Sequence, residues 1–189
     1  MNPLPYHRII VIGTTGSGKS TLAEKLARQL GLDFIDLDAL HWEPNWTDAP
    51  LDVFRQRVDV ATRKEKWALA GNYSAVRDIT WPRAEAIIWL DYPFWTSFWR
   101  LVRRTWRRCW TRELLWGTNR ENLWQQLKIW SDDSLFHWFF KTYGRRKREI
   151  PQLLALPQHA HLKVFHLTAP GSSFPADTNH QGGENAKEQ

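Results

Sequence analysis

A glycine-rich segment, residues 13–20, carries the residue types of a phosphate-binding loop. Its sequence, Gly-Thr-Thr-Gly-Ser-Gly-Lys-Ser, fits the pattern G-x-x-x-x-G-K-[ST]. Glycines let successive backbone N–H groups converge on phosphate oxygens, the lysine reaches the β and γ phosphates, and the final hydroxyl ligates Mg²⁺. The segment therefore predicts a site for ATP and Mg²⁺. The predicted nucleotide-binding residues are Gly13, Thr14, Thr15, Gly16, Ser17, Gly18, Lys19, Ser20 and Thr21.

Two carboxylates follow at alternate positions, in Phe34-Ile35-Asp36-Leu37-Asp38. Alternation along a strand places both side chains on one face, from which both can enter a shared cleft. In small-molecule kinases one such carboxylate supports the metal and the other binds or deprotonates the acceptor hydroxyl. We expect Asp36 to join Ser20 in metal support, with both carboxylates contacting the acceptor and Asp38 acting as the base. The alternative is a strand end with two solvated acids.

Further polar residues that could bind the acceptor follow two of the predicted strands. His41 and Trp42 lie in a possible acceptor loop, and Asn72 follows Gly71 at another strand end, with Arg77 just beyond. His41 could equally be a packed or surface histidine, and Arg77 a surface arginine at a helix start. Asp91 is either a metal carboxylate or, the reading we favour, the cap of the next helix.

An arginine-rich helix is predicted around residues 95–112. Its arginines form one stripe, and its tryptophans fall largely on the opposite side. We expect the helix to dock by its tryptophan face and to present Arg104 and Arg108 to the phosphates. With Arg120, in a lid that could be mobile, they would stabilise transition-state charge beside Lys19 and Asp38. The alternatives are a nucleic-acid or acidic-lipid surface and a solvated face. The stripe is Arg100, Arg103, Arg104, Arg107, Arg108 and Arg112.

The elements that must position these residues alternate between strand and helix. Short apolar runs predict strands at 8–12, 33–37, 66–70, 86–90 and 162–167, and the apolar spacing of 50–64 predicts a helix. This alternation predicts an α/β fold with a parallel sheet covered by helices on both faces. Ligands in such folds lie beyond the carboxyl ends of the strands, where the candidate residues gather. The second basic cluster, 145–148, is predicted to be a solvated helix face.

Length and composition favour a single nucleotide-binding domain. The 189 residues carry a net charge of +6 and a pI near 9.7, which suits anionic partners. A single cysteine, Cys109, and the lack of a signal-like or bilayer-spanning run predict a cytoplasmic protein without membrane insertion. We expect a domain over 1–168, a lid at about 100–130 and a disordered tail over 169–189. The tryptophan-rich region leaves both a monomer and a homodimer open.

The order of these segments resembles a known group, the adenylate-kinase-related P-loop proteins called FlaR-like or "DNA topology modulation protein". The resemblance covers about 8–168 and rests on the phosphate loop, residues 36–42, 71–73 and 89–93, the arginine helix, and 115–121. It implies a P-loop NTPase fold with five parallel strands in the order 2-3-1-4-5, use of ATP and Mg²⁺, and an arginine-rich helical lid. Two departures stand out. Ala70 occupies a position where relatives carry an acid, and 166–170 lack an arginine expected near the adenine.

Three functions are compatible with these residues. The leading hypothesis is a kinase that transfers the γ-phosphoryl group of Mg·ATP to a small hydroxyl or phosphate acceptor. A nucleotide, nucleoside, sugar acid or polyol would each suit the predicted site. The alternatives are a nucleotide-dependent DNA-binding regulator, suggested by the basic stripe, and a nucleotide-binding protein with decayed catalysis, suggested by Ala70.

Overall fold

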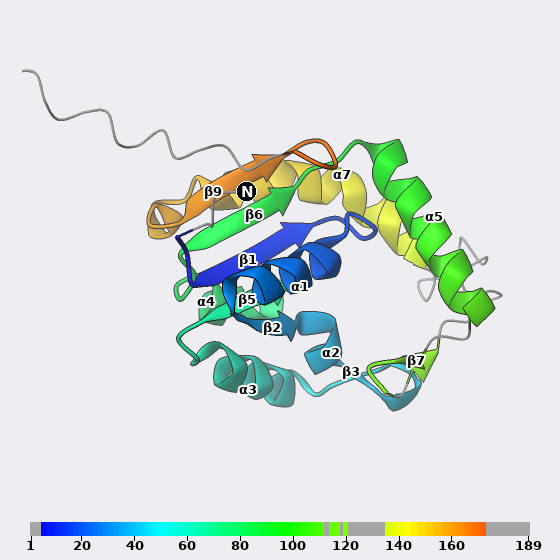
Figure 1. Ribbon diagram of the computed structural model, residues 1–189, viewed down its shortest axis with the longest axis horizontal. Helices are drawn as coiled ribbons and strands as arrows, with labels where there is room; N and C mark the ends of the chain where they lie inside the picture. The colour runs from blue at the N-terminus through cyan, green and yellow to red at the C-terminus, as the bar shows by residue number, and fades with distance from the viewer. Residues whose placement is uncertain (1–4, 112–113, 118, 121–134, 173–189) are drawn as a thin grey trace, which may run out of the picture.

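A parallel five-stranded sheet organises the chain in the computed structural model (Figure 1), which describes residues 5–111, 114–117, 119–120 and 135–172. The strand order is β2-β5-β1-β6-β9, which confirms the predicted order 2-3-1-4-5. All four neighbouring pairs are parallel. The five strands are β1 (Arg8–Gly13), β2 (Asp33–Asp36), β5 (Trp67–Ala70), β6 (Ala86–Leu90) and β9 (Lys163–Leu167).

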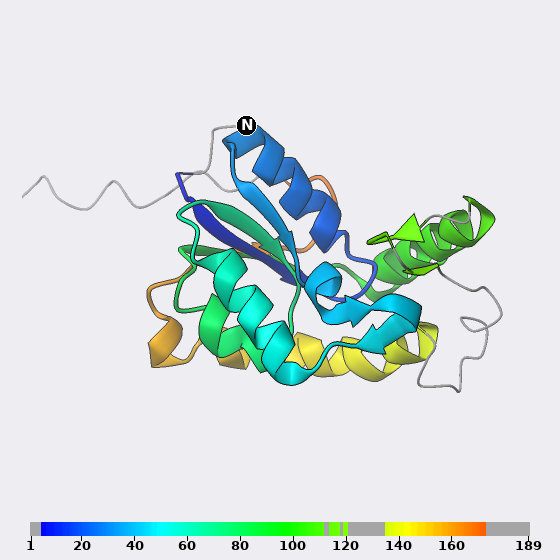
Figure 2. The same ribbon diagram turned by 90° about the horizontal axis from the view of Figure 1, so that it is seen from below.

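Helices cover both faces of this sheet, as predicted (Figure 2). The helices are α1 (Lys19–Leu30), α2 (Leu37–His41), α3 (Leu51–Thr62), α4 (Arg77–Thr80), α5 (Phe94–Thr111) and α7 (Leu135–Leu154). Two short hairpins complete the description: β3 (Trp42–Glu43) with β4 (Thr47–Asp48), and β7 (Leu114–Leu115) with β8 (Asn119–Arg120). Among the described residues, no helix combines the length and apolar character needed to span a bilayer.

The core divides into two layers because the central strand, β1, is apolar at each position from Ile9 to Ile12. Ile9 and Val11 pack on the α1 side, with Ala23 and Leu26 of that helix. Ile10 and Ile12 pack on the opposite side, in the cluster that contains Phe54 and Val58 of α3 and Ile150 of α7, with Ile79 of α4 packed against it. Burial on both faces explains why the strand reads as a continuous apolar run in the sequence.

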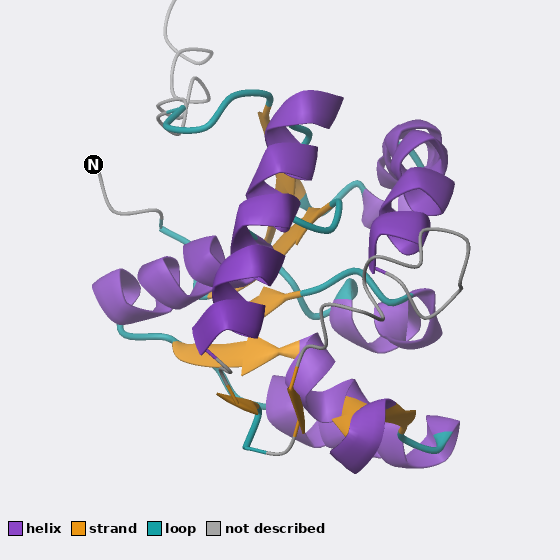
Figure 3. Cartoon of the chain, turned by 90° about the vertical axis from the view of Figure 1, so that its right-hand side faces the viewer, coloured by secondary structure: helices purple, strands orange, loops and turns teal. Residues whose placement is uncertain are grey.

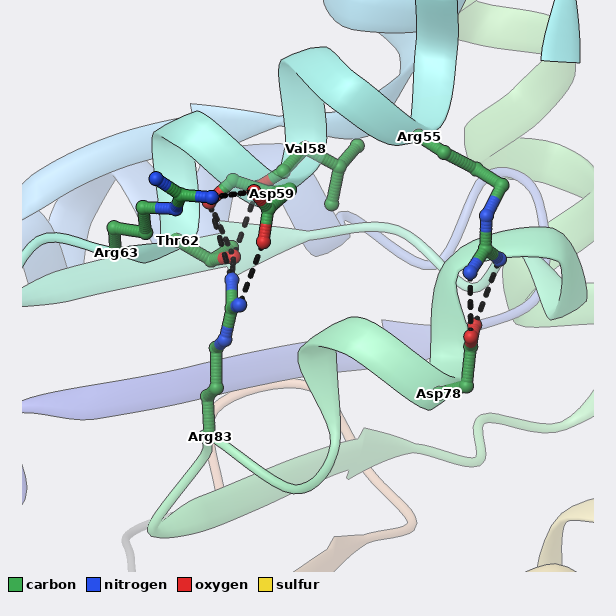
Figure 4. A network of polar contacts seen from close by, with 7 residues as sticks. All are labelled: Arg55, Val58, Asp59, Thr62, Arg63, Asp78 and Arg83. Atoms are coloured by element: carbon green, nitrogen blue, oxygen red, sulfur yellow. Dashed lines mark hydrogen bonds and ion pairs between the residues drawn. The ribbon is translucent and has the colours of Figure 1, made fainter. Parts of the chain in front are cut away.

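Polar contacts tie α3 to the segments on either side of it (Figure 4). Arg83, before β6, donates to the Asp59 carboxylate at 2.6 Å and to the Thr62 hydroxyl at 2.7 Å. Arg55 makes a two-pronged ion pair with Asp78 of α4, at 2.9 and 2.6 Å. A planar guanidinium matches a carboxylate in this way. The Arg55–Asp78 pair links α3 to α4, and the Arg83 contacts link α3 to the segment before β6. They lie apart from the phosphate loop.

The arginine-rich helix α5 docks with a different face from the one we predicted. Its buried residues are Ser97, Leu101 and Thr105. The tryptophans, which we expected to make the docking face, are exposed. The prediction was wrong because the phosphate loop passes close to the helix: a Cβ added at Gly16 would lie 2.5 Å from the Ser97 carbonyl oxygen. The backbone of α5 therefore lies too close to the loop for an indole ring to fit between them.

Candidate active site

The phosphate loop joins β1 to α1 in the strand–loop–helix arrangement that the sequence predicts. Gly16 and Gly18 have φ angles of 82° and 92°, which favour glycine. Gly18 caps α1 without a side-chain hydrogen bond, so the first N–H groups of the helix remain for a ligand. A loop with this geometry at a helix N-terminus binds phosphate oxygens through backbone amides. The predicted nucleotide-binding residues 13–21 therefore lie in one cradle.

Lys19 lies folded over this loop, among other positive charges. Its Nζ donates to the Thr14 carbonyl oxygen at 3.1 Å. Burial, and then the nearby charges of Arg146 and Arg104, lower the pKa of Lys19 to about 8, while the charge of Asp38 acts against this lowering. A concentration of cations that depresses the pKa of an ammonium group is a site that favours a bound anion.

Arg146, on α7, is the main residue that the sequence reasoning missed. We predicted that 145–148 form a solvated face, and Arg145, Lys147 and Arg148 are exposed as expected. Arg146 is instead half-buried, and its Nη1 lies 3.5 Å from the Gly13 carbonyl oxygen as a hydrogen-bond donor. Burial lowers its pKa. Spacing could have indicated this, because Phe139, Tyr143, Arg146 and Ile150 recur every three or four positions along one helical face.

The two carboxylates meet beside the loop, although not through alternation along a strand. The strand β2 ends at Asp36, which caps α2: its Oδ1 accepts from the Asp38 N–H at 3.1 Å. That part of the prediction was wrong because a capping aspartate ends the strand and starts a helix. Burial, and then the charge of Asp38, raises the pKa of Asp36 to about 6; a hydrogen bond from Ser20 acts against this rise.

Asp38 is held by Tyr73, which follows β5. The Tyr73 hydroxyl donates to Asp38 Oδ1 at 2.6 Å. Burial and the Asp38 charge raise the pKa of Tyr73, so the phenol stays protonated and remains a donor. The Tyr73 ring in turn packs against Phe54, with ring centres 5.3 Å apart. A packed ring therefore fixes the direction of the candidate base.

The other residues that we predicted to bind the acceptor do not all lie beside Asp38. His41 packs against Phe54 and Tyr73, and its Nε2 pairs with Asp48 at 3.0 Å. Arg77 lies over the Trp81 ring at 5.2 Å, and burial lowers its pKa while Glu149 opposes this.

Trp42 is half-buried at the start of the β3–β4 hairpin, and Asn72 is half-buried beside Gly71 at the end of β5. Asp91 pairs with Lys147 at 3.5 Å and with His166 at 3.0 Å, an arrangement that we did not predict.

The hairpin after α5 contacts the β3–β4 hairpin. Asn119 is buried; its Oδ1 accepts from the Trp46 N–H at 2.9 Å, and its Nδ2 donates to the Glu43 carbonyl oxygen at 3.0 Å. The rings of Trp46 and Trp116 lie 5.8 Å apart, edge to face. This part of the expected lid therefore lies on the expected acceptor loop.

Of the three predicted lid arginines, two have described side chains. Arg104 is half-buried and close enough to Lys19 to lower its pKa, and Arg108 is half-buried one turn further along α5. The Arg120 side chain, Arg112, residues 121–130 of the expected lid and residues 173–189 of the expected tail lie outside what the structure describes.

A magnesium ion fits this site only as a partner of bound phosphate. The described residues contain no group of three or more His, Cys, Asp or Glu side chains that could hold a metal. Ser20 and Asp36 are hydrogen-bonded to each other and offer two oxygen donors, and Asp36 lies beside Ala70 in the β2–β5 register. Mg²⁺ is usually held by one or two protein oxygens together with phosphate and water, which these residues allow.

Comparison with known proteins places this geometry among P-loop kinases. The family model described as "Shikimate kinase" matches residues 15–70. Shikimate kinases from two strains of Xanthomonas campestris pv. campestris are 35% identical over 66 residues, which is 35% of this chain and 35% of each relative. The match thus spans about a third of the length of these relatives.

A solved structure extends the similarity to most of the chain at the level of fold. Shikimate kinase from Acinetobacter baumannii, in complex with shikimate, superposes with a TM-score of 0.52 and 16% identity, covering 89% of this chain and 86% of that chain. The protein has the α/β fold of a P-loop kinase, and its match to the shikimate kinase family model begins at Thr15, within the phosphate loop, and includes both site carboxylates.

Proposed function

We propose that this protein is a kinase that transfers the γ-phosphoryl group of Mg·ATP to the hydroxyl of a small acceptor. The observation that carries the proposal is the position of the Asp36–Asp38 pair beside a phosphate loop whose Lys19 is surrounded by arginines. A loop of this kind binds triphosphate in several classes of protein. A carboxylate that a protonated phenol holds next to that loop could accept the proton of an attacking hydroxyl.

In the proposed mechanism, backbone amides of the loop and Lys19 hold the β and γ phosphates. Ser20 and Asp36 would hold Mg²⁺, which would neutralise charge on the phosphates. Asp38 accepts the proton of the acceptor hydroxyl as that oxygen bonds to the γ-phosphorus and the bond to the β–γ bridging oxygen breaks. Arg104 and Arg146 stabilise the charge that spreads over the transferring group; we also assign Arg108 and Arg120 to this role.

We propose a hydroxylated carboxylic acid as the acceptor class to test first. The matched relatives are named shikimate kinases, and the match includes Asp36 and Asp38. Arg146 would give the carboxylate of the acceptor an arginine partner within the same site, because its guanidinium is close enough to interact with the charges of Asp38 and Lys19. Trp42 and Asn72 would line the acceptor side. We also propose a cytoplasmic location and a nucleotide-binding domain over 1–168.

The test measures ADP release from Mg·ATP with shikimate, other hydroxylated acids, nucleosides and nucleoside monophosphates, using Lys19→Ala as the blank. With the active acceptor, we expect Asp38→Asn to lower turnover by about 10²–10⁴-fold, as loss of a general base does, with ATP affinity nearly unchanged. Asp33→Asn, at the exposed start of β2, is the matched control. Unchanged turnover in Asp38→Asn would remove this residue from the mechanism. Stimulation by nucleoside monophosphates alone would replace the acceptor class.

A nucleotide-dependent DNA-binding regulator is the second candidate, supported by the exposed Arg103 and Arg107 on α5 and by the resemblance to FlaR-like proteins. It predicts duplex binding that weakens steeply with salt and is abolished by Arg103→Glu with Arg107→Glu. A lack of affinity for duplex DNA at low salt would exclude this candidate.

A nucleotide-binding protein with decayed catalysis, suggested by Ala70, is the third candidate. It predicts tight ATP binding with no ADP release for any acceptor.

A further inference from the structure

The outer face of α5 carries a row of exposed tryptophans. Trp95, Trp99, Trp106 and Trp110 are 65%, 63%, 59% and 80% exposed. They are separated by four, seven and four positions, which places them within a stripe about 60° wide along the helix. Figure 3 shows α5 lying across the side of the molecule that faces the viewer. Large aromatic side chains aligned on a peripheral helix are a surface that favours a partner.

This face is bordered by positive charge. α5 contains five arginines and no acidic residue. Arg103 and Arg107 are exposed and fall beside the tryptophan stripe, about 20° and 60° further round the helix. The remaining arginines, Arg100, Arg104 and Arg108, fall toward the phosphate loop or the docked face; Arg100 donates to the Ser17 carbonyl oxygen at 3.2 Å.

The apolar surface continues onto α7. Phe140, 49% exposed, packs against Phe94 and Phe98 of α5, with ring centres 5.7 Å apart in both pairs. Lys141 and Arg145, next along α7, are exposed cations. The combined surface therefore joins aromatic rings from two helices to a basic border.

These observations select among the partners that could cover the face. A second copy of the chain, packed through the same helix, would bring the arginines of both copies together without an acidic partner on either helix. A bilayer with anionic headgroups complements both features, because indole rings favour the interface between water and hydrocarbon and arginines pair with lipid phosphates. We propose that α5, with Phe140 of α7, binds the surface of an anionic lipid bilayer.

The opposite side of α5 remains engaged with the phosphate loop in this arrangement. Ser97 and Leu101 pack at Gly16, and Arg100 contacts Ser17. The helix would lie in the headgroup region without crossing the bilayer, and the nucleotide cradle would lie on its protein-facing side. This proposal rests on the outer face of α5 and does not depend on the kinase activity.

Co-sedimentation with vesicles tests the proposal. The full chain is mixed at low salt with vesicles of phosphatidylcholine alone or of phosphatidylcholine with phosphatidylglycerol. We expect binding only to the anionic vesicles, and loss of binding as salt is raised. Arg103→Glu with Arg107→Glu should weaken partitioning by at least roughly 25-fold, since each cation near such a surface contributes about fivefold. Trp99→Ser with Trp110→Ser should weaken it by at least about tenfold, because both indoles leave the interface.

Matched pairs on other helices are the controls. Leu51→Ser with Val60→Ser removes two exposed apolar side chains from α3, and Lys25→Glu with Arg28→Glu reverses two exposed charges on α1. Both control pairs should bind anionic vesicles as the native chain does. Circular dichroism and the unfolding midpoint show whether each variant remains folded.

Three results would overturn the proposal. The first is no binding to anionic vesicles at low salt, or binding that both α5 variants retain. The second is a native dimer in sedimentation velocity that Trp99→Ser with Trp110→Ser dissociates, which would make a second copy the occupant. The third is displacement of the protein from vesicles by a single-stranded oligonucleotide whose binding requires the same tryptophans, which would make nucleic acid the partner.

Discussion

Replacing Asp36 by asparagine is expected to stabilise the fold at neutral pH. Burial and the neighbouring Asp38 raise the pKa of Asp36 from 3.8 to about 6, so the native state holds this carboxylate at a free-energy cost. A raised native pKa means that the folded chain binds the proton more tightly than the unfolded chain. Stability therefore falls as pH rises from about 4 through about 6, and stays reduced above that range. Asparagine removes the charge and still caps α2.

The magnitude follows from the two pKa values. At about 1.36 kcal/mol per pH unit, the rise from 3.8 to about 6 corresponds to about 3 kcal/mol at pH 8. At pH 5, about half of this remains, because the native carboxyl is then largely protonated. Asp36 is half-buried, so solvent screens part of its charge, and the variant loses the charge-assisted bond from Ser20. We therefore expect a gain of about 1–3 kcal/mol at pH 8 and about half that at pH 5.

Urea denaturation of both proteins at pH 5 and pH 8, followed by tryptophan fluorescence, measures the gain. Asp33→Asn, which removes an exposed carboxylate at the start of the same strand, is the control and should show no larger gain at pH 8 than at pH 5. The reasoning fails if Asp36→Asn is less stable than the native chain at pH 8, or if its gain is equal at the two pH values. Loss of phosphoryl transfer together with a gain in stability would identify Asp36 as a group kept for function.

Three further outcomes follow from the site geometry. Gly16→Ala should lower the free energy of unfolding by about 2–4 kcal/mol, because residue 16 has a positive φ and the new Cβ would meet the Ser97 carbonyl oxygen of α5. Gly31→Ala is the control: residue 31 also has a positive φ but faces open space, so the loss in the same urea titration should be about 1–2 kcal/mol. Asn119→Ala should weaken the contact between the two hairpins by about 2–4 kcal/mol, because it removes the bonds to Trp46 and Glu43. Faster hydrogen exchange of the backbone amides of residues 42–48 would show this loss, with Thr47→Ala as the control. ATP affinity, measured by calorimetric titration, should be greatest between about pH 6 and 8, where Asp36 is ionised and Lys19 is protonated. Arg146→Met should move the upper pH limit of tight binding to higher pH, because it removes a charge that lowers the pKa of Lys19.

The sheet could be predicted from the sequence because its strands are short apolar runs buried on both faces. The observed strands Arg8–Gly13, Asp33–Asp36 and Trp67–Ala70 lie within one residue of the predicted ranges. Their order came from the resemblance and not from the runs themselves, since an apolar run contains no information about its neighbours. The phosphate loop was predictable for a related reason: its function requires glycine at fixed positions.

The orientation of α5 could not be read from its periodicity. Helical spacing tells which residues share a face, but the docked face depends on the surface opposite it. Here that surface is the backbone at Gly16, which lies against Ser97 and Leu101 of α5 and leaves no room for indole rings. Hydrophobicity favoured the tryptophan face, and close packing against a backbone outweighed it.

The site carboxylates show how a correct proximity can be predicted from a wrong local structure. Alternation along a strand predicted that Asp36 and Asp38 point into one cleft, and they do face the same group of charges. The chain achieves this with a capping aspartate and a short helix, a choice that the sequence Asp-Leu-Asp allows as readily as an extended strand. The structure therefore supplied the information that Asp36 Oδ1 is already engaged by the Asp38 amide.

Two of the shifted pKa values at the site, those of Lys19 and Asp36, have one physical origin, and bound Mg·ATP would relieve both. Lys19 is moved toward its neutral form by burial among arginines, and Asp36 toward its neutral form by burial beside Asp38. Phosphate oxygens would favour charged Lys19, and a cation beside Ser20 would favour charged Asp36, so each ligand charge opposes the cause of one shift. Without ligand, the charged forms of Lys19 and Asp36 therefore lower the stability of the fold, and bound Mg·ATP would compensate for both charges. For that reason we expect Asp36→Asn to raise stability while it lowers function.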